Sequence, residues 1–181
     1  MASFSLYDVA IAPYLRAFQT FENILQKAKD HAGAGADAFV SARLHEDMYP
    51  LSYQVQVVTH MASHTLEQLL PHRSSLLVLE DNEKTIDDLI ARLRGVTKLM
   101  QEIEATELES AHGNTVNFVI PRPGMGGVTT DSTGYSLGYI LPNIYFHVTV
   151  AYAILRKEGV PVGKTDYWMP FLNSYILSKE W

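Results

Sequence analysis

The seven histidines of this 181-residue sequence are the residues best suited to chemistry, because histidine is both the commonest metal ligand and the usual general base. His60 and His64 are four residues apart in a segment with helical periodicity, and Gln56 lies one turn earlier. Side chains at this spacing stack on one face of a helix. That face can hold a metal ion or a general base. Because it lies opposite an apolar stripe, it can equally be the solvated side of an amphipathic helix.

His147 lies in a different setting. Residues 132–155 contain no Asp, Glu, Lys or Arg, and the helix expected over residues 137–157 is apolar on nearly every side. Such a helix is enclosed by protein. Asn143 lies one turn before His147, and an unpaired buried polar group costs about 1–3 kcal/mol, so both side chains need partners. His147 is therefore the strongest catalytic candidate, and the alternative is a core histidine bonded to a neighbouring helix.

The elements that would position these residues are predicted from hydrophobic periodicity. Four long helices are expected over residues 6–30, 50–71, 82–104 and 137–157, with a kink at Pro13 and Asn82 as N-cap of the third. Alternating residues at 115–120 and 128–131, around a turn rich in Pro and Gly, predict a hairpin. Short connections favour antiparallel neighbours. The predicted fold class is all-α: an antiparallel four-helix bundle with a small β-hairpin between helices three and four.

Composition excludes several classes of protein. The absence of cysteine excludes a disulfide scaffold, a thiolate zinc site and a cysteine nucleophile. A net charge of −6 argues against nucleic-acid and membrane partners, which require concentrated Lys and Arg. The first ten residues lack the basic start of a signal peptide, so we expect a cytoplasmic protein. Residues 132–155 are long enough to span a bilayer, but Pro142, Asn143 and His147 favour a buried helix.

Three segments together resemble a known family: Ala42-Arg-Leu-x-x-Asp-Met-Tyr-Pro-Leu51 with Gln54-Val-Gln56; Tyr135-x-Leu-Gly-Tyr-x-Leu-Pro-Asn143-x-x-Phe-His147-Val-Thr-x-Ala-Tyr152-x-Ile-Leu-Arg156; and Gly159-Val-x-Val-Gly163-Lys-x-Asp-Tyr167. The sequence is similar, over about residues 4–167, to uncharacterised bacterial and fungal proteins of the DinB/YfiT-like four-helix-bundle superfamily. The Pro-Asn-x-x-Phe-His stretch is the most specific part.

This resemblance implies a site between helices two and four. Many members of the superfamily hold a divalent ion with one histidine from helix two and a His-x3-His pair from helix four. Carried over, the site consists of His60, Asn143 and His147, with His64 or Gln56 as substitutes, and Asn143 stands where the family has histidine. A metal would be Zn, Ni or Mn bound by His60, His147 and His64. Periodicity alone does not direct His60 toward helix four.

The function that these observations favour is a cofactor-independent lyase, isomerase or cyclase of secondary metabolism. His147 would be general base or acid, oriented by Asn143 and assisted by His60. We expect a small apolar organic substrate, bound by Tyr14, Tyr53, Gln56, Tyr145 and Tyr152. The alternatives are a divalent-metal-dependent DinB-like transferase or isomerase, and a non-catalytic ligand-binding or dimeric interaction protein. Residues 1–167 would form the bundle, and the apolar tail 168–181 a lid or a contact within a homodimer.

Overall fold

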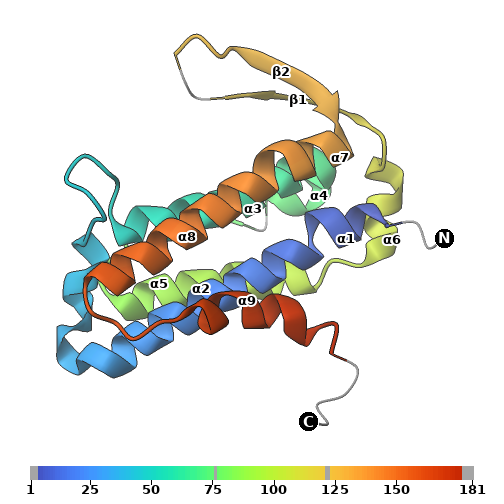
Figure 1. Cartoon of the computed structure of the whole chain (residues 1–181). Coiled ribbons are helices and arrows are strands. Elements are labelled where there is room, and N and C mark those ends of the chain that lie inside the picture. The colour runs from blue at the N-terminus through green and yellow to red at the C-terminus, as the bar shows by residue number, and fades with distance from the viewer. Residues whose placement is uncertain (1–3, 76, 121–122, 177–181) are drawn as a thin grey trace.

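Two helices, rather than one over residues 6–30, form the N-terminal part of the bundle. The computed structural model describes residues 4–75, 77–120 and 123–176, and these helices are α1 (Leu6–Ala10) and α2 (Ala12–Ala32) (Figure 1). Pro13 has no N–H to donate to the carbonyl four residues earlier, and the backbone at Ile11 departs from helical geometry (φ −115°, ψ −54°). The kink predicted at Pro13 is therefore a break between two helices.

The third long helix begins later than its expected start at Asn82. After the 3₁₀ segment η1 (Gly33–Ser41), the chain forms α3 (Leu51–Leu69), the single turn α4 (Pro71–Ser74) and α5 (Ile86–Gln101). Thr85 is the N-cap of α5: its hydroxyl accepts the N–H of Asp88 at 3.0 Å, and the Asp88 carboxylate accepts the N–H of Thr85 at 2.9 Å. Asn82 instead donates to Glu80, so its prediction as N-cap was wrong. The capping box satisfies two N–H groups and thereby fixes the start.

Replacing Thr85 with alanine is expected to lower the free energy of unfolding by about 1 kcal/mol, because the N–H of Asp88 loses its acceptor. The matched variant Asn82→Ala alters a residue outside α5 and should change the same quantity by less than about 0.5 kcal/mol. Urea unfolding followed by circular dichroism measures both variants. Equal losses would mean that Thr85 does not cap α5.

The bundle consists of α2, α3, α5 and α8 (Leu141–Lys157), as predicted (Figure 1). The helices α3 and α8 lie side by side and run in opposite directions. However, α3 and α5 run in the same direction, because residues 77–85 return along the length of α3 instead of reversing the chain after Pro71. Nine extended residues span about 30 Å, and α3 is about 28 Å long. At this one crossing the connection is long, so α3 and α5 are parallel, whereas a short connection after Pro71 would have made them antiparallel.

The hairpin and the helix that follows it form one end of the molecule. After α6 (Ala105–Leu108) and η2 (Glu109–Ala111), β1 (Thr115–Val119) pairs antiparallel with β2 (Gly127–Asp131), which confirms the predicted hairpin. The chain then forms α7 (Ser132–Tyr135) and a π-helical turn, η3 (Ser136–Ile140), which leads into α8. Pro142 cannot donate to the carbonyl four residues earlier, and the π turn stands where that bond is lost. The hairpin projects beyond the bundle, over α3 and α8 (Figure 1).

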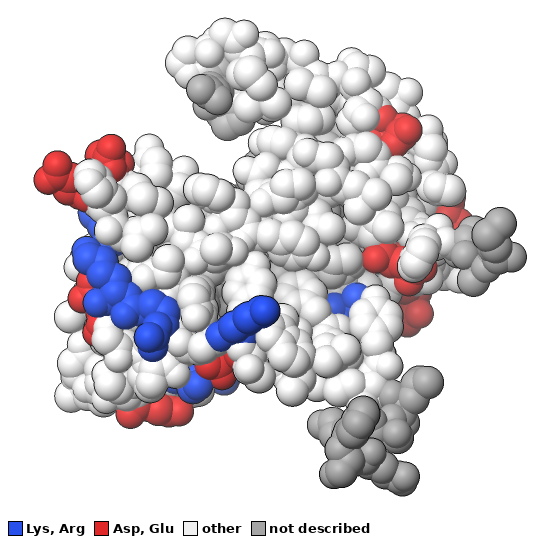
Figure 2. All heavy atoms as spheres, in the orientation of Figure 1, with Lys and Arg blue, Asp and Glu red and all other residues white. Residues whose placement is uncertain are grey.

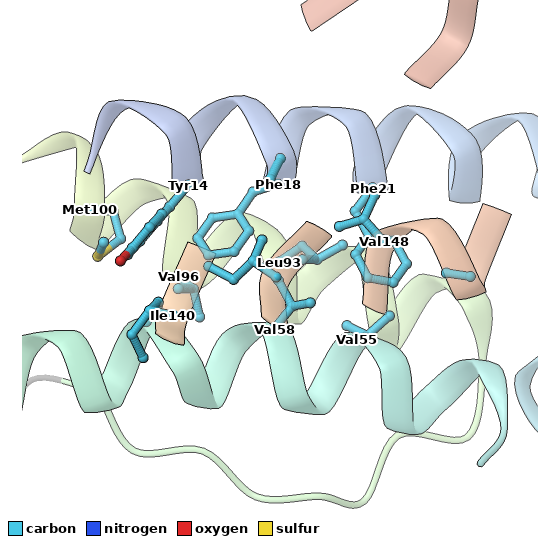
Figure 3. Close-up of a cluster of buried hydrophobic side chains, with 14 of the residues drawn as sticks. Tyr14, Phe18, Phe21, Val55, Val58, Leu93, Val96, Met100, Ile140 and Val148 are labelled. Atoms are coloured by element: carbon cyan, nitrogen blue, oxygen red, sulfur yellow. The ribbon is translucent and has the colours of Figure 1, made fainter. Parts of the chain in front are cut away.

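The core is built from the inward faces of the four long helices (Figure 3). Side chains from all four interdigitate there, among them Tyr14, Phe18, Phe21, Val55, Val58, Leu93, Val96, Met100 and Val148, and each is almost fully buried. The apolar stripes read from the sequence for these helices are therefore the faces that pack together. The line of contact between α3 and α8 reaches the surface, where His147 is partly exposed, and this line is called the groove between α3 and α8.

The first part of the predicted tail, residues 168–173, continues a helix that packs against the bundle. The helix α9 (Lys164–Asn173) packs against α2, where Lys27 forms an ion pair with Asp166 at 2.8 Å and Thr20 donates to the carbonyl of Tyr167 at 2.8 Å. The expected boundary between residues 167 and 168 therefore falls inside a helix. Residues 177–181 lie outside the described residues. A role of the tail as a lid or a dimer contact stays a prediction.

One segment, Ser132–Lys157, is long and apolar enough by length and composition to cross a membrane. Core helices of soluble proteins pass the same test, and here Ile144, Val148 and Ile154 are packed in the core. Only 33% of its most apolar window is buried, so α8 also contributes to the surface. Figure 2 shows that this surface carries no Lys, Arg, Asp or Glu over the middle of α8.

Candidate functional site

His147 of α8 and Gln54 of α3 form the polar contact in the groove between the two helices. His147 Nδ1 lies 2.7 Å from Gln54 Oε1. Gln54 is 2% exposed, whereas His147 is half-buried and retains access to solvent. Figure 2 shows a notch on this side of the molecule, between the hairpin and the loop that precedes α3. The predicted enclosure of His147 is therefore incomplete, since one side of the groove is open.

The orientation of Gln54 decides which nitrogen of His147 carries the proton. Gln54 Nε2 donates to the carbonyls of Tyr49 at 3.0 Å and Pro50 at 3.3 Å, and this directs Oε1 toward the imidazole. Because a carbonyl oxygen can only accept, Nδ1 must hold the proton and Nε2 keeps its lone pair. Among the described residues Nε2 has no hydrogen-bond partner. The groove therefore presents an unprotonated nitrogen in a fixed orientation.

The surroundings of His147 keep it neutral. Burial lowers the pKa of His147 to about 4, because the charged imidazolium loses hydration in the groove. Aromatic rings border it: the Tyr53 ring lies edge-on at 6.3 Å between centroids and the Phe146 ring at 5.3 Å. Tyr49 stacks on Tyr53 at 4.0 Å. Burial, followed by the neighbouring Tyr49 and Asp81, raises the pKa of Tyr53, which therefore keeps its hydroxyl proton at neutral pH.

His60 and Gln56 face a different part of the molecule. His60 Nε2 lies 3.0 Å from Asp81 Oδ1, and Gln56 Nε2 donates to Glu83 Oε2 at 2.8 Å. Both therefore contact the returning segment rather than α8. Gln54 and His60 are six residues apart, which in a helix is about 9 Å along the axis and about 120° around it. The structure does not bring His60 together with His147, and the residue that faces His147 from α3 is Gln54.

Asn143 and His64 form their hydrogen bonds with other residues and none with His147. Asn143 Nδ2 donates to the carbonyl of Tyr139 at 2.6 Å, a bond to the preceding turn of its own helix. His64 Nδ1 lies 3.0 Å from Glu67 one turn later, and its ring lines a cavity under the hairpin. The expected orientation of His147 by Asn143 is therefore supplied by Gln54 in the structure.

Of the expected substrate-binding tyrosines, only Tyr53 borders His147. Tyr14 is fully buried in the core. Tyr145 packs edge-on against Phe171 at 5.6 Å, and Tyr152 packs against Tyr167 at 6.3 Å. Both of these rings lie on the side of α8 that faces α9. Their helical spacing from His147 could not distinguish that side from the groove, because α8 is apolar on both.

The residues around His147 do not fit the three-histidine metal site that the resemblance implied. The amide nitrogen of Asn143 faces a carbonyl, the acceptor that α3 places beside His147 is already bonded to its Nδ1, and His60 faces Asp81. Across residues 4–75, 77–120 and 123–176, no group of three or more His, Asp or Glu side chains is placed to hold an ion. The Zn, Ni or Mn site of His60, His64 and His147 stays a prediction without a matching arrangement of ligands.

Gln54 is the residue of this site that sequence reasoning missed as a candidate. It lies between Leu51 and Val58 on the side of α3 that is otherwise apolar, and it is one of few buried polar side chains. A polar residue next to an apolar stripe was the available signal, because such a residue must find a buried partner. Gln56, two residues later, was predicted as a site residue instead because it shares a helix face with His60 and His64.

The fold defines a class of protein, the DinB-like four-helix bundle. A crystal structure of a DinB family member from Shewanella denitrificans is similar to this chain with a TM-score of 0.77 and 27% sequence identity, over 90% of each chain. Residues 6–168 match the family described as a domain of unknown function, DUF1993. The chain therefore belongs to the DUF1993 family. No curated protein matches it.

Proposed function

We propose that the protein is a cofactor-independent enzyme that moves a proton on a small, apolar organic molecule bound in the groove between α3 and α8. The observation that carries this proposal is the orientation of His147, whose Nδ1 is held by Gln54 so that Nε2 can accept a proton. General base catalysis needs a positioned lone pair of this kind. The aromatic rings of Tyr53 and Phe146 offer an apolar surface beside it.

Tyr53 supplies the second half of the proposed chemistry. A base that removes a proton next to a carbonyl leaves negative charge on the carbonyl oxygen, and a protonated phenol can donate a hydrogen bond to that oxygen. The Tyr53 ring borders His147, and its raised pKa keeps the hydroxyl protonated at neutral pH. A base and a hydrogen-bond donor on the same groove suit an isomerase, a lyase or a cyclase.

Formation of a homodimer and a cytoplasmic location remain predictions.

The proposal is tested by proton exchange. A panel of small aromatic and aliphatic ketones in D2O should lose its α-proton NMR signals faster with the protein than without it. The variant His147→Gln keeps a polar side chain but removes the base, and it should slow the exchange about 100-fold or more. Tyr145→Phe, on the face toward α9, serves as the matched control and should exchange at the wild-type rate.

Nitrogen-15 NMR gives an independent check on the same site. At pH 7 the imidazole of His147 should show a protonated Nδ1 and an unprotonated Nε2. The reverse tautomer, or equal exchange rates in wild type and His147→Gln, would contradict the proposal.

A further inference from the structure

A cavity under the hairpin, separate from the proposed catalytic groove, has the composition of a ligand site. It measures about 470 Å³, within the range of small-molecule pockets. Met61, His64 and Gln68 of α3 form one wall, and Phe118 of β1 forms another. Tyr135 of α7 and Tyr139 of the π turn close it. The cavity therefore forms where the hairpin crosses α3 and the start of the last long helix.

Three aromatic rings make this cavity suited to a flat molecule. The Phe118 ring lies 5.0 Å from that of Tyr135 and 4.6 Å from that of Tyr139, and the two tyrosine rings are 6.0 Å apart. These three rings pack on one another, and Phe118 and Tyr139, which are only partly buried, keep ring surface on which a further ring can pack by offset stacking or edge-to-face contact. The thioether of Met61 adds a polarizable surface. A planar ring is the shape that these contacts favour.

The polar groups of the cavity include two tyrosine hydroxyls that can donate to a ligand. No hydrogen bond joins the hydroxyl of Tyr135 or that of Tyr139 to another described residue, and neither oxygen is among the buried side-chain atoms that lack a partner. Burial raises the pKa of both tyrosines, so both hydroxyls keep their protons. The Asn117 Oδ1 accepts from Thr129 at 2.7 Å, which leaves the amide N–H groups of Asn117 for another partner. A ligand oxygen can accept from these groups in place of water.

The charge of the described lining disfavours anions. No Lys or Arg among the described residues lines the cavity, and the carboxylate of Glu67 is bonded to His64, which does line it. An anionic ligand would therefore be repelled by Glu67.

We propose that the cavity between α3, β1 and the π turn binds a neutral, planar aromatic molecule that carries a carbonyl oxygen, which accepts the hydroxyl hydrogen of Tyr135 or Tyr139. The side chains that line this cavity are different from those around His147, so the site does not depend on the proposed proton transfer. A carbonyl group is expected on the ligand because its oxygen can accept from the tyrosine hydroxyls.

Three probes of similar size test the inference: acetophenone, ethylbenzene, which lacks the carbonyl, and benzoate, which carries a negative charge. Binding is measured by chemical-shift titration of the whole protein. Acetophenone should bind about fivefold more tightly than ethylbenzene, and benzoate should bind most weakly. In the variant Tyr135→Phe/Tyr139→Phe the preference for acetophenone over ethylbenzene should disappear, while ethylbenzene affinity stays the same.

The control Tyr145→Phe removes a hydroxyl from the other side of α8 and should keep the fivefold preference. Three results would overturn the inference: equal binding of acetophenone and ethylbenzene to the wild type, a preference that survives in the double variant, or shifts centred on His147 instead of Tyr135. Because acetophenone also belongs to the ketones proposed for the groove, affinity for the cavity is taken from the shifts of residues that line it, such as Met61 and Phe118, and separately from the shifts of His147, so the two proposals can fail separately.

Discussion

Replacing Arg92 with methionine is expected to lower the free energy of unfolding by about 3–5 kcal/mol, because it leaves the carboxylate of Glu83 buried without a cation. The Arg92 side chain is 5% exposed and that of Glu83 is 7% exposed, and Nη1 lies 2.6 Å from Oε1. Methionine has a similar length, so little packing is lost. Urea unfolding followed by circular dichroism measures the change.

Arg92 is expected to contribute this much to stability because its guanidinium joins α5 to both α3 and the returning segment, residues 77–85. From α5 it donates to Thr59 of α3 at 2.7 Å through Nε, and to the carbonyl of Glu80 at 2.8 Å. A third contact joins it to Asp81 at 2.9 Å. Since residues 77–85 must return along α3 before α5 can begin, this guanidinium fixes the crossing that sets the parallel arrangement of α3 and α5.

Arg94→Met is the matched control on the same helix. Arg94 forms an ion pair with Glu22 at 2.7 Å, but its side chain is 61% exposed, and exposed pairs contribute about 0–1 kcal/mol. The double variant Arg92→Met/Glu83→Gln should recover part of the loss, because the neutral amide no longer needs a cation. Equal losses for Arg92→Met and Arg94→Met would contradict a special role for the buried pair.

The sequence predicts the elements of this fold better than their connections. The helices follow from apolar stripes, and the hairpin from alternation around Pro and Gly, because each is a local pattern. The return of residues 77–85 along α3 depends on Arg92, whose partners Thr59 and Glu83 are distant in sequence or on another element. A charged residue beside an apolar stripe does not reveal such a contact.

The candidate site was predictable in part for a similar reason. His147 stood out because it lies in an uncharged helix, but its partner could come from any neighbouring helix. The resemblance directed attention to His60, which is bonded instead to Asp81. Helical phase gives the face on which a residue lies, and only the packing of α8 beside Gln54 selects the residue that completes the site.

The stability of the protein is expected to depend on the protonation of His147 between about pH 4 and 6.5. Its pKa is about 4 in the folded protein and ordinary, near 6.5, in the unfolded chain, so the unfolded chain binds more protons in this window. The free energy of unfolding therefore rises with pH through the window and falls as the pH is lowered. The full difference amounts to about 3 kcal/mol, since one pKa unit corresponds to about 1.4 kcal/mol.

The difference in unfolding free energy between the wild type and His147→Gln isolates this contribution from other titrating groups. This difference, wild type minus variant, should be constant above about pH 7. It should decrease by up to about 3 kcal/mol as the pH falls to 4, because only the wild type loses stability through His147. A difference independent of pH would contradict burial as the cause of the low pKa.

The same pKa should determine the pH dependence of activity. A base that stays unprotonated down to about pH 4 loses activity only in that range, so the acid limb of ketone exchange should lie near pH 4 rather than 6.5.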